Sequence, residues 1–234
     1  MNMSVPKPES KNRVAFTRVE LLAVLAVLLL LAGIVLPSLA GHKPRSQRVT
    51  CFNNLRTIGF GWRMWAGDHD DLPPWITRTN VGGTMANPNP YIHFLVASNE
   101  LVTPKMLVCP SDTQTRQMAR DWREFNTGPF RGNAMSYAVG TDANFSQPRL
   151  ILGLDRHCDG ARVTSCGSAQ IAPVLALEGL ANPNLRWNTT NIHAGTGNLL
   201  FSDGTVRETT SPTLLQALKD SQDTSSNNHI LPPR

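Results

Sequence analysis

One long apolar segment near the N-terminus limits what this chain can fold into. Residues 21–41 run for 21 positions without a charged side chain, and almost all of them are Leu, Val, Ala or Ile. At about 1.5 Å per residue, a helix of that length extends about 30 Å, the thickness of the hydrocarbon core of a bilayer. A secretory signal peptide has a shorter apolar region, of about 7 to 15 residues. The sequence therefore predicts one membrane-spanning helix.

Basic side chains flank this segment on both sides. Before it stand Lys7, Lys11, Arg13 and Arg18, and after it stand His42, Lys43, Arg45 and Arg48. Positively charged flanks tend to stay in the cytoplasm, and the first cluster places the N-terminus there. We therefore expect most of the chain to lie outside the cytoplasm, in the periplasm or the extracellular space.

The overall charge does not indicate a nucleic-acid partner. The chain has 234 residues and a net charge of +5, of which the segment before Phe16 carries +2, from three Lys or Arg residues against Glu9. No later stretch interleaves basic and aromatic residues in the way a nucleic-acid site does. We expect no nucleic acid among the partners, and one globular domain outside the membrane.

The residues at the start of the apolar segment resemble a known processing signal. Residues 15–22 (AFTRVELL), followed by an apolar helix that contains Pro37, closely resemble the class III signal of type IV pilins and of type II secretion pseudopilins. In that family a prepilin peptidase cuts before the Phe and methylates the new N-terminus. The resemblance implies cleavage between Ala15 and Phe16, N-methylation of Phe16, and assembly roles for Glu20 and Pro37. The family usually has Gly in place of Ala15 and an apolar residue in place of Arg18.

Glu20 has two explanations. A carboxylate at the edge of hydrocarbon is costly unless it is paired, and cleavage would create a positive amino group at Phe16, in the same chain or in a neighbour. Pairing between chains would fix the stagger of adjacent subunits. In the second explanation, Thr17 and Glu20 form a capping box, in which each side chain bonds the backbone of the other.

The same resemblance implies a structural function. We expect a subunit or minor subunit of a type IV pilus or of a type II secretion pseudopilus, single-pass in the bacterial inner membrane. Its partners would be the prepilin peptidase, other pilin or pseudopilin subunits and inner-membrane lipid. The chain would not be an enzyme, with no catalytic residue, cofactor or metal, and the motifs of serine hydrolases, zinc proteases and phosphate loops are missing. The alternative is a membrane-anchored extracytoplasmic binding or enzymatic domain that keeps an uncleaved signal anchor.

A second helix is expected directly after the apolar segment. Apolar residues recur at steps of four and three along residues 42–66, which predicts an amphipathic helix with one buried face. They are Cys51, Leu55, Ile58, Trp62 and Trp65. Gly59 and Gly61 lower helix propensity, so a weak end near Ala66 is expected.

The rest of the chain reads as a β-rich domain, which gives an α+β, pilin-like fold with a long N-terminal helix packed on an antiparallel sheet. Short apolar runs separated by turn residues predict strands at 92–96, 106–108, 135–139, 150–154, 171–177 and 198–201. Asp203-Gly204 predicts a type I′ hairpin turn. Residues 211–218 predict a short helix, and the polar residues 220–234 a flexible tail. The organisation is thus leader (1–15), membrane helix (16–41), amphipathic helix (42–66), outer domain (67–219) and tail (220–234).

An acidic loop follows the amphipathic helix. Residues 67–74 contain three Asp residues and His69, which are possible cation ligands. The spacing lacks the pattern of an EF-hand, so a solvated loop is favoured.

A second resemblance concerns the C-terminal part. His193, nine further residues and Asp203-Gly204 resemble a His-nine-Asp-Gly element found in a large group of bacterial proteins that carry the prepilin signal, and residues 53–56 and 109–112 resemble the same group. A hydrogen bond between His193 and Asp203 across the hairpin would be structural. Metal binding or general-base chemistry would need further ligands or a nucleophile.

The four cysteines allow three full pairings. We favour Cys158 with Cys166, which would close a polar loop, and then Cys51 with Cys109, which would tie the helix to the sheet. Zinc is the competing explanation, although no Cys-x-x-Cys occurs. Cys51 on the core stripe could also be a buried free thiol.

Overall fold

The structure is a computed structural model that describes residues 17–40, 42–112, 116–166, 168–177, 184–189, 192–221 and 228–233. It divides into two compact units, Met1–Lys43 and Pro44–Arg234. The expected leader and the expected cleavage point between Ala15 and Phe16 lie outside the described residues.

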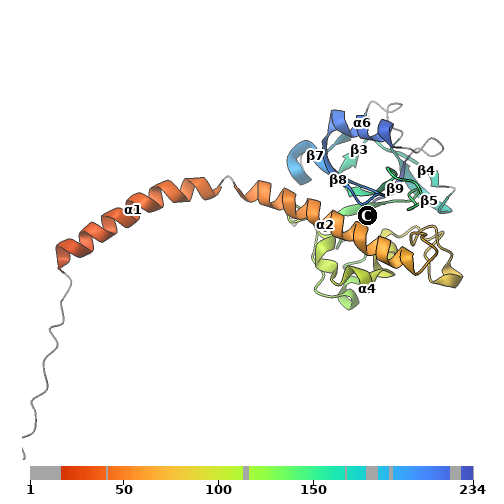
Figure 1. Ribbon diagram of the computed structural model, residues 1–234, viewed down its shortest axis with the longest axis horizontal. Coiled ribbons are helices and arrows are strands. Elements are labelled where there is room, and N and C mark those ends of the chain that lie inside the picture. The colour runs from red at the N-terminus through yellow and green to blue at the C-terminus, as the bar shows by residue number, and fades with distance from the viewer. Residues whose placement is uncertain are drawn as a thin grey trace, which may run out of the picture. The chain divides into compact units, whose positions relative to one another are not determined.

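The first unit contains helix α1, Arg18–Ala40 (Figure 1). Its Arg18–Val35 window is long and apolar enough to cross a membrane by length and composition, and none of it is buried. The helical backbone continues through Pro37 to Ala40, and Gly41 lies outside the described residues.

The amphipathic helix is confirmed as α2, His42–Gly67. All five residues of the expected stripe are buried, from Cys51 to Trp65. The helix ends at Gly67, close to the expected end near Ala66, and the two glycines within it are sites of close packing. A Cβ on Gly59 would lie 2.8 Å from Leu200 Cδ1, and one on Gly61 would lie 2.5 Å from Leu101 Cδ2. Glycine therefore lets α2 approach its neighbours.

The second unit is built on an antiparallel sheet of seven strands, in the order β4-β5-β9-β1-β2-β7-β8. The strands are β1 (Tyr137–Gly140), β2 (Ile151–Asp155), β4 (Arg162–Cys166), β5 (Ile171–Ala176), β7 (Thr196–Phe201), β8 (Val206–Thr210) and β9 (His229–Leu231). A small second sheet pairs β3 (Cys158–Asp159) with β6 (Arg186–Trp187). The expected α+β class with an antiparallel sheet is confirmed.

The large sheet carries an apolar core on each face. Successive side chains of a strand point to opposite faces, so Leu199 belongs to one core and Leu200 to the other. The core that contains Leu200 also contains the buried stripe of α2. The core that contains Leu199 includes Leu214 of helix α6, Ser211–Asp220, which confirms the expected short helix. Figure 1 shows α2 and α6 on opposite sides of the sheet.

Short helices connect α2 to the sheet, and two of them replace expected strands. They are η1 (Thr79–Val81), α3 (Pro90–Leu95), α4 (Ser98–Leu101), η2 (Pro104–Leu107) and α5 (Trp122–Phe125). The strands expected at 92–96 and 106–108 are therefore wrong. Pro90 and Pro104 stand in the first turn of α3 and η2, where the fixed φ of proline favours a helix start. The apolar runs that suggested strands are the buried faces of these short helices.

Part of the expected flexible tail, residues 220–234, is a strand, while residues 222–227 and 234 lie outside the described residues. β9 lies inside the large sheet and pairs with β1 on one side and β5 on the other. Ile230 and Leu231 are each 2% exposed, and they belong to different cores. Their burial on both faces outweighs the polar composition of the surrounding sequence.

Candidate functional site

The start of α1 forms the capping box that was one of the two explanations for Glu20. The Thr17 backbone N–H and the Thr17 hydroxyl each donate to Glu20 Oε2 at 2.8 Å, and the Glu20 N–H donates to Thr17 Oγ1 at 3.2 Å. Within the described residues, these bonds use only one of the two carboxylate oxygens. Capping therefore does not compete with a cation at Oε1.

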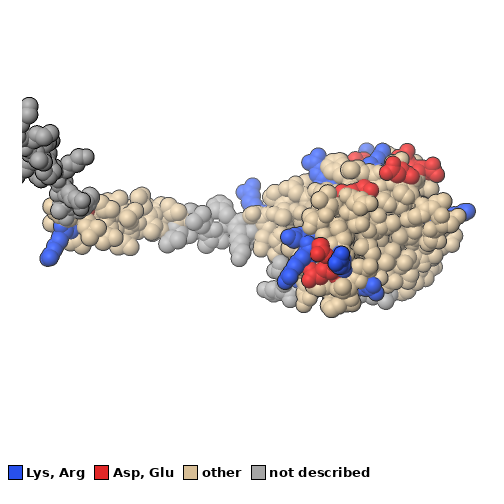
Figure 2. All heavy atoms as spheres, turned by 90° about the horizontal axis from the view of Figure 1, so that it is seen from below, with Lys and Arg blue, Asp and Glu red and all other residues tan. Residues whose placement is uncertain are grey.

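The apolar side chains of α1 are exposed all around the helix. Four consecutive residues, Leu28 to Leu31, are 55%, 72%, 66% and 51% exposed. Because successive residues of a helix are about 100° apart, these four together cover its whole circumference. The face of α1 that Figure 2 shows has no charged side chain beyond its first residues. A helix that is apolar on every side is typical of one surrounded by apolar material, and α1 is long and apolar enough to span a membrane.

His193 lies in η4 (Ile192–Gly195), directly before β7, and its side chain is buried. Its Nε2 lies 3.5 Å from Cys109 Sγ and 3.8 Å from Asp155 Oδ2. Asp155 Oδ2 accepts hydrogen bonds from Asn198 N at 2.7 Å and from Asn198 Nδ2 at 3.0 Å. Burial lowers the pKa of His193 to about 4 and raises the pKa of Asp155 to about 7. Both shifts disfavour charge in the core, so His193 is neutral at neutral pH.

The backbone around His193 is left-handed for three residues. His193, Ala194 and Gly195 have φ of 58°, 49° and 88°, a conformation that costs about 1 kcal/mol or more for a residue with a side chain. The His193 carbonyl accepts from Arg48 Nη2 at 3.3 Å and from Thr196 Oγ1 at 3.0 Å. These bonds hold the turn against α2. These contacts fix the position of the backbone where β7 begins.

Asp203 does not bond to His193, so the expected contact across the hairpin is wrong. Asp203 Oδ1 instead accepts from Thr205 N at 2.8 Å and from Thr205 Oγ1 at 2.6 Å. His193 and Asp203 stand at opposite ends of β7, and a strand of this length extends about 20 Å. Two side chains so placed cannot meet.

The hairpin itself is confirmed, but its turn is not type I′. Phe201 N donates to Thr205 O and Gly204 N donates to Phe201 O, each at 2.9 Å. Gly204 has φ of 83°, and Asp203 does not have the positive φ that a type I′ turn also requires. Residues 202–204 therefore form a three-residue loop with glycine in the left-handed position.

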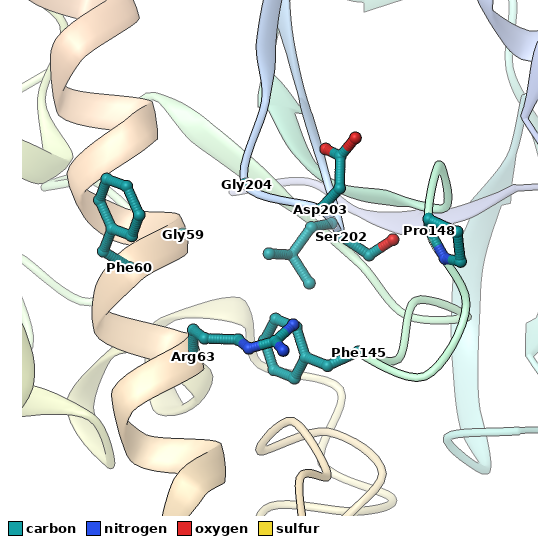
Figure 3. A pocket seen from close by; sticks show the side chains of 9 residues that line it. Gly59, Phe60, Arg63, Phe145, Pro148, Ser202, Asp203 and Gly204 are labelled. Carbon is teal, nitrogen blue, oxygen red and sulfur yellow. The ribbon is translucent and has the colours of Figure 1, made fainter.

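This turn lines a groove of about 400 Å³ beside α2 (Figure 3). Gly59, Phe60 and Arg63 of α2 form one side, and Ser202 to Gly204 form the other. The Arg63 guanidinium lies 5.0 Å from the centre of the Phe145 ring. Figure 3 shows the Asp203 carboxylate pointing away from Arg63. The groove thus contains the Asp-Gly part of the motif, whereas His193 lies in the core.

The cysteines pair differently from the favoured expectation. Cys51 is disulfide-bonded to Cys109, as the second expectation proposed, and Cys158 and Cys166 are free thiols. Cys158 belongs to the core on the α6 face and Cys166 to the core on the α2 face, so the sheet separates them. This separation explains why the favoured Cys158–Cys166 pair does not form.

Two groups of described residues have metal-ligand chemistry. In the first, Cys51, Cys109 and His193 converge, but the two sulfur atoms are committed to the disulfide and neither is a thiolate. The second group is Asp142, Cys166 and His229. It escaped prediction because its members lie far apart in the sequence and share no motif.

The acidic loop after α2 is not among these groups. The His69 ring stacks on the Trp65 ring, with 3.6 Å between centroids, and its Nδ1 lies 2.7 Å from Trp65 O. His69 is thereby turned back onto the helix. In the part of the chain that the structure describes, residues 68–71 do not form a three-ligand group.

Comparison of the chain with protein-family models, with curated proteins and with solved structures finds no match. The geometry and the sequence alone therefore support the functional proposals.

Proposed function

We propose that this chain is a structural subunit, major or minor, of a type IV pilus or of a type II secretion pseudopilus. In this proposal α1 lies in the bacterial inner membrane before assembly, and the Pro44–Arg234 unit lies outside the cytoplasm. A prepilin peptidase removes residues 1–15 and methylates Phe16. The chain is a substrate of that peptidase and not an enzyme.

One observation carries the proposal: α1 is apolar and exposed on every side and has a single carboxylate at its start. The exposed apolar side chains of α1 need surroundings that exclude water. Lipid would provide them for a single subunit, and neighbouring helices would provide them in an assembly. A plain anchor explains the apolar length. The capping box explains a side chain that accepts hydrogen bonds at position 20, but it gives no use for the negative charge of Glu20 at the edge of the hydrocarbon.

Assembly gives Glu20 a partner. The capping box uses Oε2, so the other oxygen can pair with the amino group of Phe16 on an adjacent subunit. The capping box holds the carboxylate in place before that contact forms. The two explanations of Glu20 are then compatible, and pairing sets the axial stagger of subunits.

The test is intact-mass analysis of the chain extracted from membranes. We expect a protein that begins at Phe16 and carries one added methyl group. The matched control is the same chain from cells that lack prepilin peptidase, which should begin at Met1.

A chain that keeps Met1 in both strains would overturn the proposal. That result would favour the alternative, a membrane-anchored extracytoplasmic domain with an uncleaved signal anchor.

A further inference from the structure

Three side chains with different metal-binding atoms converge at one edge of the globular unit. Asp142 follows β1, Cys166 is the last residue of β4, and His229 is the first residue of β9. β9 pairs with β1, which places His229 beside the end of β1 that leads into Asp142. Cys166 pairs with Ile171 at the start of β5, and its thiol reaches Asp142 Oδ1. Their carboxylate, thiol and imidazole atoms all lie within 4.8 Å of one another.

Asp142 stands between the other two. Its Oδ1 lies 3.0 Å from Cys166 Sγ, and its Oδ2 lies 2.9 Å from His229 Nδ1. The Asp142 and His229 side chains are 10% and 11% exposed, and Cys166 is 2% exposed. The cluster is thus nearly buried but open to solvent on one side.

We propose that Asp142, Cys166 and His229 bind a zinc ion, with the fourth coordination position left to water. Sulfur, imidazole nitrogen and carboxylate oxygen are the three ligand types that zinc takes in proteins. Calcium and magnesium favour sites made only of oxygen ligands, so a thiol and an imidazole argue against both.

The cluster suits this ion after a small rearrangement. With Zn–S of about 2.3 Å and bonds of about 2.0 Å to nitrogen and oxygen, tetrahedral ligands lie about 3.3 to 3.5 Å apart. The present separations are those of hydrogen bonds and end on different oxygens: Cys166 Sγ lies 3.0 Å from Asp142 Oδ1, and His229 Nδ1 lies 2.9 Å from Asp142 Oδ2. The three ligand atoms lie within 4.8 Å of one another, so small side-chain rotations bring them to tetrahedral spacing.

Zinc would replace hydrogen bonds that now involve the thiol proton. Without metal the Cys166 thiol donates a hydrogen bond to Asp142 Oδ1 at 3.0 Å. Binding forms a Zn–S bond and releases that proton to solvent, with no change of oxidation state. The Ser168 hydroxyl, which donates to Asp142 Oδ1 at 2.9 Å, keeps the carboxylate oriented.

The site would fasten the last strand to the sheet. His229 opens β9, and its backbone N–H donates to Asp142 Oδ2 at 2.7 Å. A metal bound to Asp142, Cys166 and His229 joins the ends of three strands that are distant in the sequence. Zinc binding should therefore raise the melting temperature of the folded chain.

The experiment titrates the processed or unprocessed full chain, purified in detergent without a polyhistidine tag, with Zn²⁺ and then with Co²⁺ as a spectroscopic substitute. We expect one ion per chain, release of about one proton per zinc, and a thiolate-to-cobalt charge-transfer band. The sequence has 4 cysteines and two of them form the disulfide, so Cys158 or Cys166 must supply that thiolate.

The variants C166S and C158S separate these two thiols. C166S should abolish the cobalt band and weaken zinc binding by about 100-fold or more, since loss of an outer-shell partner alone costs about 10- to 100-fold. C158S should retain the cobalt band and the zinc affinity of the unmodified chain. If C166S does not fold, the cobalt spectra of the unmodified chain and of C158S still test the proposal. A missing thiolate band in the unmodified chain, or loss of that band in C158S, would overturn it.

Discussion

Glu20 is the residue on which the proposed assembly depends. In the isolated chain, its carboxylate accepts two hydrogen bonds from Thr17. Capping of this kind stabilises a helix start by about 1 kcal/mol, and either Glu or Gln can close the box. Pairing with an amino group needs the negative charge, which only Glu carries. Charge and capping can therefore be separated by substitution.

We predict that Glu20→Gln blocks assembly, whereas Thr17→Val leaves it largely intact. Glu20→Gln keeps an oxygen for the capping box but removes the charge that pairs with Phe16. Thr17→Val removes the capping hydroxyl and keeps the charge. The measurement is the amount of each variant in fibres sheared from cells, relative to its amount in the membrane. Normal assembly of Glu20→Gln would contradict the pairing.

At the scale of elements, β9 holds the large sheet together. It separates β4 and β5 on one side from β1, β2, β7 and β8 on the other. Ile230 lies in the core on the α6 face, and Leu231 lies in the core on the α2 face. One three-residue strand thus contributes to both cores, although it stands at the end of a polar segment.

We predict that Ile230→Ala and Leu231→Ala each lower the free energy of unfolding by about 2 to 5 kcal/mol, the usual cost of truncating a buried aliphatic side chain. Val163→Ala in β4 is the matched control, because Val163 is 67% exposed and its truncation should cost about 0.5 kcal/mol or less. Denaturant unfolding followed by tryptophan fluorescence measures the difference. Equal midpoints for all three variants would show that β9 does not carry this burial.

At the scale of the whole molecule, the disulfide joins the N-terminal helix of the second unit to the segment before the sheet. Cys51 of α2 and Cys109 are 58 residues apart in the sequence, and both are buried. A crosslink over a loop of this length restricts the unfolded chain and so favours the folded one. The core that contains Leu200 connects α2 to the sheet, and the disulfide adds a covalent link to the segment before it.

We predict that the double variant Cys51→Ala, Cys109→Ala is less stable by about 4 kcal/mol, the loop-closure entropy for a loop of this size. Cys158→Ala, which removes a free thiol from the other core, should cost less. Chemical denaturation of both variants under non-reducing conditions measures the two effects. A double variant as stable as the parent chain would argue against the disulfide.

The sequence by itself determined the features that depend on local pattern. These are the apolar segment that became α1, the buried stripe of α2, helix α6 and four of the expected strands, because helical and strand periodicities are properties of neighbouring residues. The Asp203-Gly204 hairpin followed from turn chemistry in the same way, although the loop proved one residue longer than a type I′ turn.

Only the tertiary structure decided which distant residues meet. Cys51 pairs with Cys109 because α2 packs on the sheet, and Cys158 stays apart from Cys166 because the sheet lies between them. β9 is a strand because two cores and two partner strands stabilise a segment whose own composition favours a coil. Asp142, Cys166 and His229 also come together only in the tertiary structure, because their distances do not follow from their spacing in the sequence.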